Sequence, residues 1–308
     1  MKNIKIAISG ELGSGKTVLS KRLSEVLGME VISIGKIQRN LAQKYGMTTL
    51  EFNKYLETHP EIDEEFDDSV TRYGLGETPL ILDSRLAWHF VPGSFKIHLL
   101  VDNTIAAKRI FNDDIRKDEK YISIEEAKAN LTERKNSETI RFKQQYGVDI
   151  DNLCNYDLVV DTGLSSPEII FEKVLEIFNK WKQDIEFNHF YFSPKSLLPT
   201  QSIGEQSFKY IKNITESIKE HDFFEDSPVL IIKDFNKYFI YDGHKRVSSA
   251  IKNKCDLIPC RLVGNEKHKL LINQNSKEYL RDNYSLKHVY DWEAMHEFTF
   301  PEYVADFE

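Results

Sequence analysis

"GELGSGKT", residues 10–17, decides the fold of the first half of this chain, because its glycines, lysine and threonine have the spacing of a phosphate-binding loop. A β-rich run, IKIAIS at 4–9, precedes it, and an amphipathic stretch, TVLSKRLSEVLG at 17–28, follows it. A strand, a glycine-rich turn and a helix in this order present backbone N–H groups and a helix N-terminus to an anion. The sequence therefore predicts a P-loop that binds nucleotide phosphates.

The side chains of the loop have distinct expected tasks. Lys16 would reach the β- and γ-phosphates of ATP, and the hydroxyl of Thr17 would bind Mg²⁺. ATP and Mg²⁺ are thus the cofactors that the motif implies. The alternative, a glycine-rich turn that binds nothing, is disfavoured by the strand and helix on either side. The residues expected to hold the nucleotide are Gly10, Gly13, Ser14, Gly15, Lys16, Thr17 and Val18.

The first 185 residues alternate strand and helix signals. Amphipathic stretches separate the β-rich runs, and capping boxes at Thr48/Glu51 and Ser123/Glu126 mark two helix starts. Alternation of this kind predicts an α/β fold with a five-stranded parallel sheet covered by helices. The further runs are VISI at 31–34, PLILD at 79–83, KIHLLV at 96–101 and YDLVVDT at 156–162.

Charged residues follow the strand ends, where ligands bind in such sheets. Asp83 ends the β-rich run at 79–83 and Arg85 follows it, so we expect Asp83 near the Mg²⁺ and Arg85 near the acceptor. Lys36 and Arg39 open the helix after the second run and complete the expected acceptor site.

A long helix in the second half of this region carries two arginines on one face. Arg134 and Arg141 are seven residues apart, as a helical lid that clamps transferring phosphates would need. The predicted catalytic residues are Lys16, Asp83, Arg134 and Arg141, with Thr17 and Asp83 as the metal ligands.

Residues 4 to about 180 resemble the archaeal-type cytidylate kinases of the nucleoside monophosphate kinase family. The resemblance implies that the loop binds ATP, that Arg39 and Arg85 hold the acceptor phosphate, and that lid arginines neutralise the transition state. The chain departs from the family at Lys36, usually acidic, and at Asp83-Ser84-Arg85, usually Glu-Gly-Arg. The matching stretches are ISGELGSGKT, IGKIQRNLAQKYGMTTLEFNKYLETHPEIDEEFD, ILDSRLAWHF, RKNSETIRFKQQYGVDI and NYDLVVDT.

The departures raise a second interpretation of the acceptor side. A lysine at position 36 would reverse the local charge beside the acceptor base. Asp83 followed by an arginine also resembles an element of deoxynucleoside kinases, in which the carboxylate acts as base toward a hydroxyl. Asp83 is therefore either a Mg²⁺ ligand or a general base.

The stretch YFIYDGHKRVSSAIKNKCDLIPCRLV, residues 238–263, predicts a strand, a helix and a second strand. Backbone amides and cations at the first turn predict a phosphate site formed by Asp242, Gly243, His244, Lys245 and Arg246. This turn resembles the core motif of the ParB/sulfiredoxin-like fold, and the resemblance covers about residues 195–263. We expect a P-loop kinase-like domain at 1–188 and a smaller α+β ParB-like domain at 195–308, with a helix at 205–220 and an acidic tail.

Composition limits the function classes. The net charge of −8 and a pI of about 5.7 argue against a general polyanion binder, although residues 195–290 hold 16 Lys and Arg against 12 Asp and Glu. Cys154, Cys255 and Cys260 form neither a disulfide framework nor a zinc pattern, and Cys260 is expected in a strand. No leader or membrane-length apolar stretch is visible, so we expect a soluble, intracellular, cytoplasmic protein without a membrane partner.

Three functional hypotheses stay open. The chain is an ATP- and Mg²⁺-dependent kinase of a pyrimidine nucleoside monophosphate such as CMP or dCMP. Alternatively, it phosphorylates a hydroxyl of a modified base, a hydroxymethylpyrimidine, in DNA that the ParB-like domain binds. In the third hypothesis that domain is an independent nucleotide-binding or small-molecule kinase site. The sequence does not indicate an oligomeric state.

Overall fold

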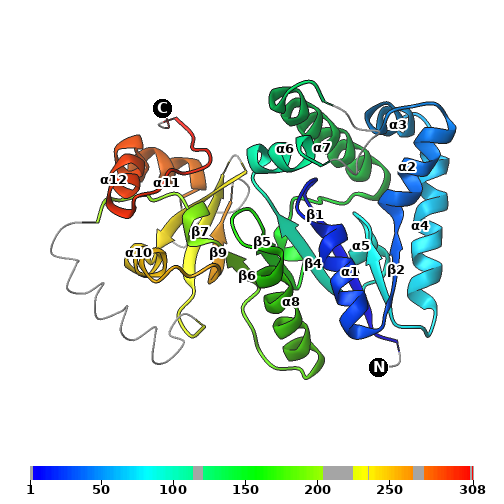
Figure 1. Cartoon of the computed structure of the whole chain (residues 1–308), viewed down its shortest axis with the longest axis horizontal. Coiled ribbons are helices and arrows are strands. Elements are labelled where there is room, and N and C mark those ends of the chain that lie inside the picture. Colours follow the sequence, from blue (N-terminus) through cyan, green and yellow to red (C-terminus); the bar gives the residue numbers. More distant parts are fainter. Residues whose placement is uncertain are drawn as a thin grey trace. The chain divides into compact units, whose positions relative to one another are not determined.

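The computed structural model of the chain describes residues 3–113, 121–203, 225–234, 236–265, 274–305 and 307. It divides into two compact units, shown in Figure 1. The first unit comprises Met1–Thr162 and Pro167–Asp184, and the second comprises Gly163–Ser166 and Ile185–Glu308. The helix expected at 205–220 lies outside the described residues.

The first unit is built on a parallel sheet. Its strands follow the order β2-β3-β1-β4-β5, and each neighbouring pair is parallel. The residues of β1, β3 and β5 are buried throughout, as strands covered on both faces require. The predicted five-stranded parallel sheet is therefore confirmed. The strands are β1 (Lys5–Gly10), β2 (Glu30–Ser33), β3 (Leu80–Asp83), β4 (Phe95–Leu100) and β5 (Leu158–Asp161).

Helices connect and cover these strands. α1 and α8 lie side by side (Figure 1), and Arg22 of α1 joins them through an ion pair with Glu168 at 2.5 Å. The helices are α1 (Lys16–Leu27), α2 (Ile34–Lys44), α3 (Thr49–Leu56), α4 (Pro60–Leu75), α5 (Ala87–Phe90), α6 (Asn103–Phe111), α7 (Ile124–Tyr146) and α8 (Pro167–Lys182), with a 3₁₀ turn η1 (Leu153–Asn155).

The two predicted capping boxes differ in outcome. At Thr48 the box forms completely, because its side chain accepts from the Glu51 N–H and the Glu51 carboxylate accepts from the Thr48 N–H. At Ser123 only the hydroxyl half forms, since the Glu126 carboxylate accepts from the N–H of Ile122 instead. Both side chains still cap their helices, α3 and α7.

The second unit has a mixed sheet in the order β6-β9-β7-β8. β7 is parallel to β9 and antiparallel to β8, and β6 is antiparallel to β9. The strand, helix and strand predicted over 238–263 are confirmed, whereas the resemblance to the ParB/sulfiredoxin-like fold stays a prediction. The elements are β6 (Phe190–Phe192), η2 (Pro194–Ser196), β7 (Val229–Asp234), β8 (Lys237–Asp242), α10 (His244–Lys252), β9 (Ile258–Gly264), α11 (Ser276–Asn283) and α12 (Leu286–His296).

Two expectations from composition can be compared with the structure. Cys260 lies buried in β9, as expected, and Cys154 and Cys255 are free thiols as well. Within the described parts of the chain, the structure contains no helix with both the length and the apolar character needed to cross a membrane.

Candidate functional site

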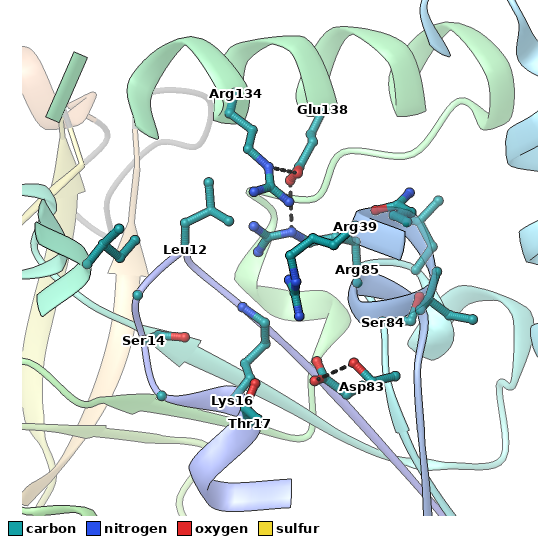
Figure 2. Close-up of a pocket in the computed structure, with 18 of the residues that line it drawn as sticks. Leu12, Ser14, Lys16, Thr17, Arg39, Asp83, Ser84, Arg85, Arg134 and Glu138 are labelled. Carbon is teal, nitrogen blue, oxygen red and sulfur yellow. Dashed lines mark hydrogen bonds and ion pairs between the residues drawn. The ribbon is translucent and has the colours of Figure 1, made fainter. Parts of the chain in front are cut away.

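A cavity of about 500 Å³ lies in the first unit, where the glycine-rich loop, the ends of β2 and β3, and α2, α4, α6 and α7 meet. Cations and carboxylates from most of these elements share its lining (Figure 2). The cationic residues are Lys16, Arg39, Arg85, Arg109, Arg134 and Arg141. The acidic residues are Asp67, Asp83, Asp113 and Glu138.

Two glycines give the loop its close packing. Gly10 has φ 145°, and a Cβ there would lie 2.4 Å from the carbonyl oxygen of Leu99 in β4. Gly13 has φ 75°, and a Cβ there would lie 3.1 Å from Ala106 in α6. Only glycine combines these dihedrals with such contacts, so the loop curls between β4 and α6.

Hydrogen bonds hold the interior of the loop. Ser14 Oγ donates to the Glu11 carbonyl at 2.8 Å, and Lys16 Nζ donates to the carbonyls of Gly10 and Glu11 at 2.9 and 2.8 Å. Burial, aided by the nearby Arg85 guanidinium, lowers the pKa of Lys16 to about 7, although Asp83 and other carboxylates oppose the shift. Lys16 is thus poised to gain a proton when an anion binds.

The structure brings most of the predicted loop residues to the cavity. Residues 13–18 line it, and Gly10 ends β1 just before the loop. The Thr17 side chain is exposed at the start of α1, where its hydroxyl can reach a bound ligand.

Asp83 ends β3 directly beside the end of β2. The parallel register pairs Ser33 with Asp83, and Ser33 Oγ donates to Asp83 Oδ2 at 3.2 Å. Figure 2 shows the Asp83 carboxylate next to Lys16 and Thr17. The register between two strands therefore fixes the carboxylate on the loop side of the cavity.

Hydroxyl and carboxylate oxygens at this position suit Mg²⁺. Thr17 and Asp83 supply hard oxygen donors, and among the described residues no group of three or more His, Cys, Asp or Glu could hold a metal alone. Mg²⁺ characteristically binds through one or two protein ligands and completes its shell with water and phosphate oxygens. The residues present thus fit a Mg²⁺ that arrives with a nucleotide.

Glu138 of α7 joins two arginines in the cavity. Its Oε2 lies 2.8 Å from Arg85 Nε, and its Oε1 lies 3.1 Å from Arg134 Nε (Figure 2). The Glu138 side chain is 4% exposed. Burial raises the pKa of this carboxyl, but Arg85, Arg134 and Arg141 outweigh burial and hold it below its usual value. The carboxylate is therefore ionised between its partners.

The other predicted acceptor and lid residues have separate places. Arg39 of α2 lines the cavity, whereas Lys36 is exposed and is not among the lining residues. Arg141 lines the cavity but also donates to the Asn53 carbonyl of α3 at 3.2 Å. Its guanidinium lies 5.0 Å from the centre of the Phe142 ring. Arg141 thus links α7 to α3.

Several residues of the site were absent from the sequence predictions, among them Glu138, Ser33 and Arg109. Glu138 has a signal in its spacing, since it lies four residues after Arg134 on one helix. Ser33 ends the strand that pairs with β3, which the strand order alone would reveal. Arg109 donates to the carbonyls of Gly13 and Thr162 at 3.3 and 2.6 Å, and its sequence context contains no comparable signal.

The phosphate site predicted in the second unit is arranged differently. Arg246 pairs with Asp242 at 3.0 Å and donates to the carbonyls of Ser227 and Pro228. Gly243 caps α10 with φ 104°, and Lys245 is exposed. A phosphate site at this turn stays a prediction.

His244 of the same turn is directed into the core. It is 4% exposed, and its Nε2 accepts from the Thr200 N–H at 3.2 Å. Burial, with a smaller effect of His288, lowers the pKa of His244 to about 3. A neutral, buried imidazole supplies no cation to an anion, so any anion site here would depend on other members of the turn.

Comparison with protein families gives a match over residues 5–164, to the model of the cytidylate kinase-like family. The cytidylate kinase of Methanosarcina acetivorans is 38% identical over 162 residues, which are 52% of this chain and 87% of that protein. The S-adenosylmethionine-dependent nucleotide dehydratase of Lacinutrix mariniflava is 35% identical over 177 residues, which are 57% of this chain. That match spans only 36% of the Lacinutrix protein.

Solved structures also resemble this chain. The shikimate kinase of Bacteroides thetaiotaomicron covers 57% of the chain and 98% of its own length, with a TM-score of 0.39 and 12% sequence identity.

Proposed function

The chain belongs to the cytidylate kinase-like family and is a kinase, and from this premise we propose that it transfers the γ-phosphoryl group of ATP to a pyrimidine nucleoside monophosphate. The acceptor would be CMP or dCMP. The observation that supports the proposal most is one cavity in which Arg85 and Arg134 meet at Glu138, across from the loop lysine (Figure 2). Such a cavity offers cations to both a donor and an acceptor phosphate.

The proposed reaction needs no protein base. A non-bridging oxygen of the acceptor phosphate, already anionic, attacks the γ-phosphorus. The bond from that phosphorus to the β–γ bridging oxygen breaks, and its electron pair leaves on ADP. Lys16 would contact the β- and γ-phosphates, and Arg85 would hold the acceptor phosphate in line with the donor. Arg134 would neutralise charge on the transferring group.

Asp83 serves the metal in this proposal. Its carboxylate accepts from Ser33 and lies beside Thr17, the other expected ligand. Mg²⁺ held there would neutralise charge on the donor phosphates. A base for a hydroxyl acceptor would instead have to face the acceptor, so the position of Asp83 supports a monophosphate over a hydroxymethylated base in DNA.

The proposal is tested by incubating the full chain with γ-labelled ATP and Mg²⁺ and a panel of acceptors. The panel contains CMP, dCMP, UMP, AMP and a DNA duplex with hydroxymethylpyrimidines. We expect label in the diphosphate product of CMP or dCMP. In Lys16→Ala the rate should fall by about 10² or more, because the loop loses its charge on the γ-phosphate.

The control is Lys21→Ala, an exposed lysine of α1 that pairs with Glu25. It should retain wild-type turnover. Label in the duplex without label in any free nucleotide would overturn the proposal in favour of a base-hydroxyl kinase. Undiminished turnover in Lys16→Ala would remove the loop from the mechanism.

A further inference from the structure

Glu138 is the residue through which the end of β3 and the helix α7 meet in the cavity. We propose that Glu138 is a positioning residue, which aligns Arg85 and Arg134 so that the acceptor phosphate and the transferring phosphoryl group are held in one line. The inference rests on the proposed function, because it concerns how that site orders its arginines. It assigns Glu138 no contact with either substrate.

The first support is the geometry of the two ion pairs. Each oxygen of the carboxylate pairs with the Nε of a different arginine. Oε2 pairs with Arg85, and Oε1 pairs with Arg134. A guanidinium is a rigid planar fork, so fixing its Nε edge fixes the directions of its Nη groups. A single carboxylate thus sets the relative orientation of two cations that come from separate elements.

The second support is burial. The side chains of Glu138, Arg134 and Arg85 are 4%, 11% and 19% exposed. Exposed pairs of this kind exchange freely with water and hold no fixed geometry, whereas a buried carboxylate between two cations does. The alignment is therefore present before a ligand binds.

The third support is that α7 has other attachments to the first unit. Ser137 Oγ donates to Glu57, Arg141 donates to Asn53, and Lys135 pairs with Glu11 at 2.9 Å and with Asp151 at 3.2 Å. These contacts hold the helix through residues other than Glu138. Removing that carboxylate should disturb the arginines more than the fold.

The test compares Glu138→Gln and Glu138→Asp with wild type, using the full chain. We expect kcat to fall by about 10- to 100-fold in Glu138→Gln, because misplaced catalytic groups cost about this much. The KM for the acceptor should not rise, since losing an anion leaves the cavity more positive. Glu138→Asp, which keeps the charge on a shorter arm, should recover part of kcat.

The matched control is Glu133→Gln on the same helix. Glu133 pairs with Lys54 in an exposed ion pair and lies outside the cavity lining, so the variant should turn over like wild type. Calorimetric titration with inorganic tripolyphosphate adds a readout without an acceptor. Glu138→Gln should bind it at least as tightly as wild type does.

A double variant separates positioning from other roles. If Glu138 acts through its arginines, Glu138→Gln should cost much less in an Arg134→Gln background than in wild type. Independent effects that multiply would overturn the inference. So would wild-type kcat in folded Glu138→Gln, or weaker tripolyphosphate binding, which would indicate a purely structural carboxylate.

The same measurements keep the two proposals apart. Wild-type turnover of CMP or dCMP tests the proposed function. The positioning role of Glu138 is tested by two other quantities. One is the ratio of variant to wild-type kcat with whichever acceptor the wild type phosphorylates, and the other is the tripolyphosphate affinity.

Discussion

Lys16 of the phosphate loop has a pKa well below that of an ordinary lysine. Burial beside Arg85 brings its pKa to about 7, so about half of the ligand-free protein has a neutral Lys16 at pH 7. Bound phosphates favour the charged form and raise this pKa. Nucleotide binding should therefore be coupled to proton uptake.

We predict that binding of Mg²⁺-ATP takes up a fraction of a proton per protein, and that this fraction increases as pH rises through about 7, because more of the ligand-free protein then has a neutral Lys16. Affinity should accordingly weaken as pH rises through 7. Calorimetry in buffers of different ionisation enthalpy measures the uptake. The control Lys21→Met should leave the proton uptake unchanged. A binding enthalpy at pH 8 that is the same in all buffers would contradict the prediction.

At the residue scale, the sequence predicted which residues lie together wherever a motif and the strand order indicate the same place. Lys16, Asp83 and Arg85 share one cavity because a glycine-rich loop and a parallel strand end have known relative positions. Glu138 escaped prediction because a carboxylate four residues from an arginine is typical of exposed helix surfaces. Burial, which gives this pair its importance, depends on the tertiary fold.

At the scale of elements, β1 and β4 meet closely at Gly10. We predict that Gly10→Ala lowers the free energy of unfolding by about 3 kcal/mol, because the new Cβ would lie 2.4 Å from the Leu99 carbonyl. Two controls separate the clash from backbone strain. Gly28→Ala, with φ 65° and open space, should cost about 1 kcal/mol, and Gly93→Ala, also in open space, about zero.

Denaturant unfolding of the three variants measures these differences. Equal stability of Gly10→Ala and Gly93→Ala would show that β1 and β4 can separate without loss.

Among the elements that the sequence failed to predict are α11 and α12. The stretch from 265 onward shows no clear period, yet Leu280, Val289 and Trp292 are buried there. Each helix is short, and its few apolar residues are too sparse to produce a recognisable stripe. A capping box between Asn275 and Glu278 was the available signal for the start of α11.

At the scale of the whole molecule, acid should affect the second unit through buried histidine. His244 has a pKa of about 3 in the folded protein, mainly because it is buried, and about 6.5 when unfolded. Between these values the unfolded chain binds the additional proton. Stability from this group is complete above pH 6.5 and is lost as pH falls below it, by about 1.4 kcal/mol per pH unit.

We predict that His244→Gln reduces this pH dependence, because Gln can accept from the Thr200 N–H without titrating. Thermal unfolding between pH 8 and 4.5, followed by tryptophan fluorescence, to which buried Trp292 of the second unit contributes, measures the slope. The exposed His189→Gln is the control and should behave like wild type. A slope unchanged in His244→Gln would assign the acid sensitivity to other groups.

The crowding of arginines around one cavity has a practical side. Arg39, Arg85 and Arg134 are among six cationic residues that line a space of about 500 Å³, and four carboxylates line it with them. Because its lining carries more positive than negative charges, we expect this pocket to bind small inorganic anions. Sulfate or inorganic phosphate carried over from purification should compete there with nucleotides. The kinase rate measured for a preparation should therefore depend on its buffer salt.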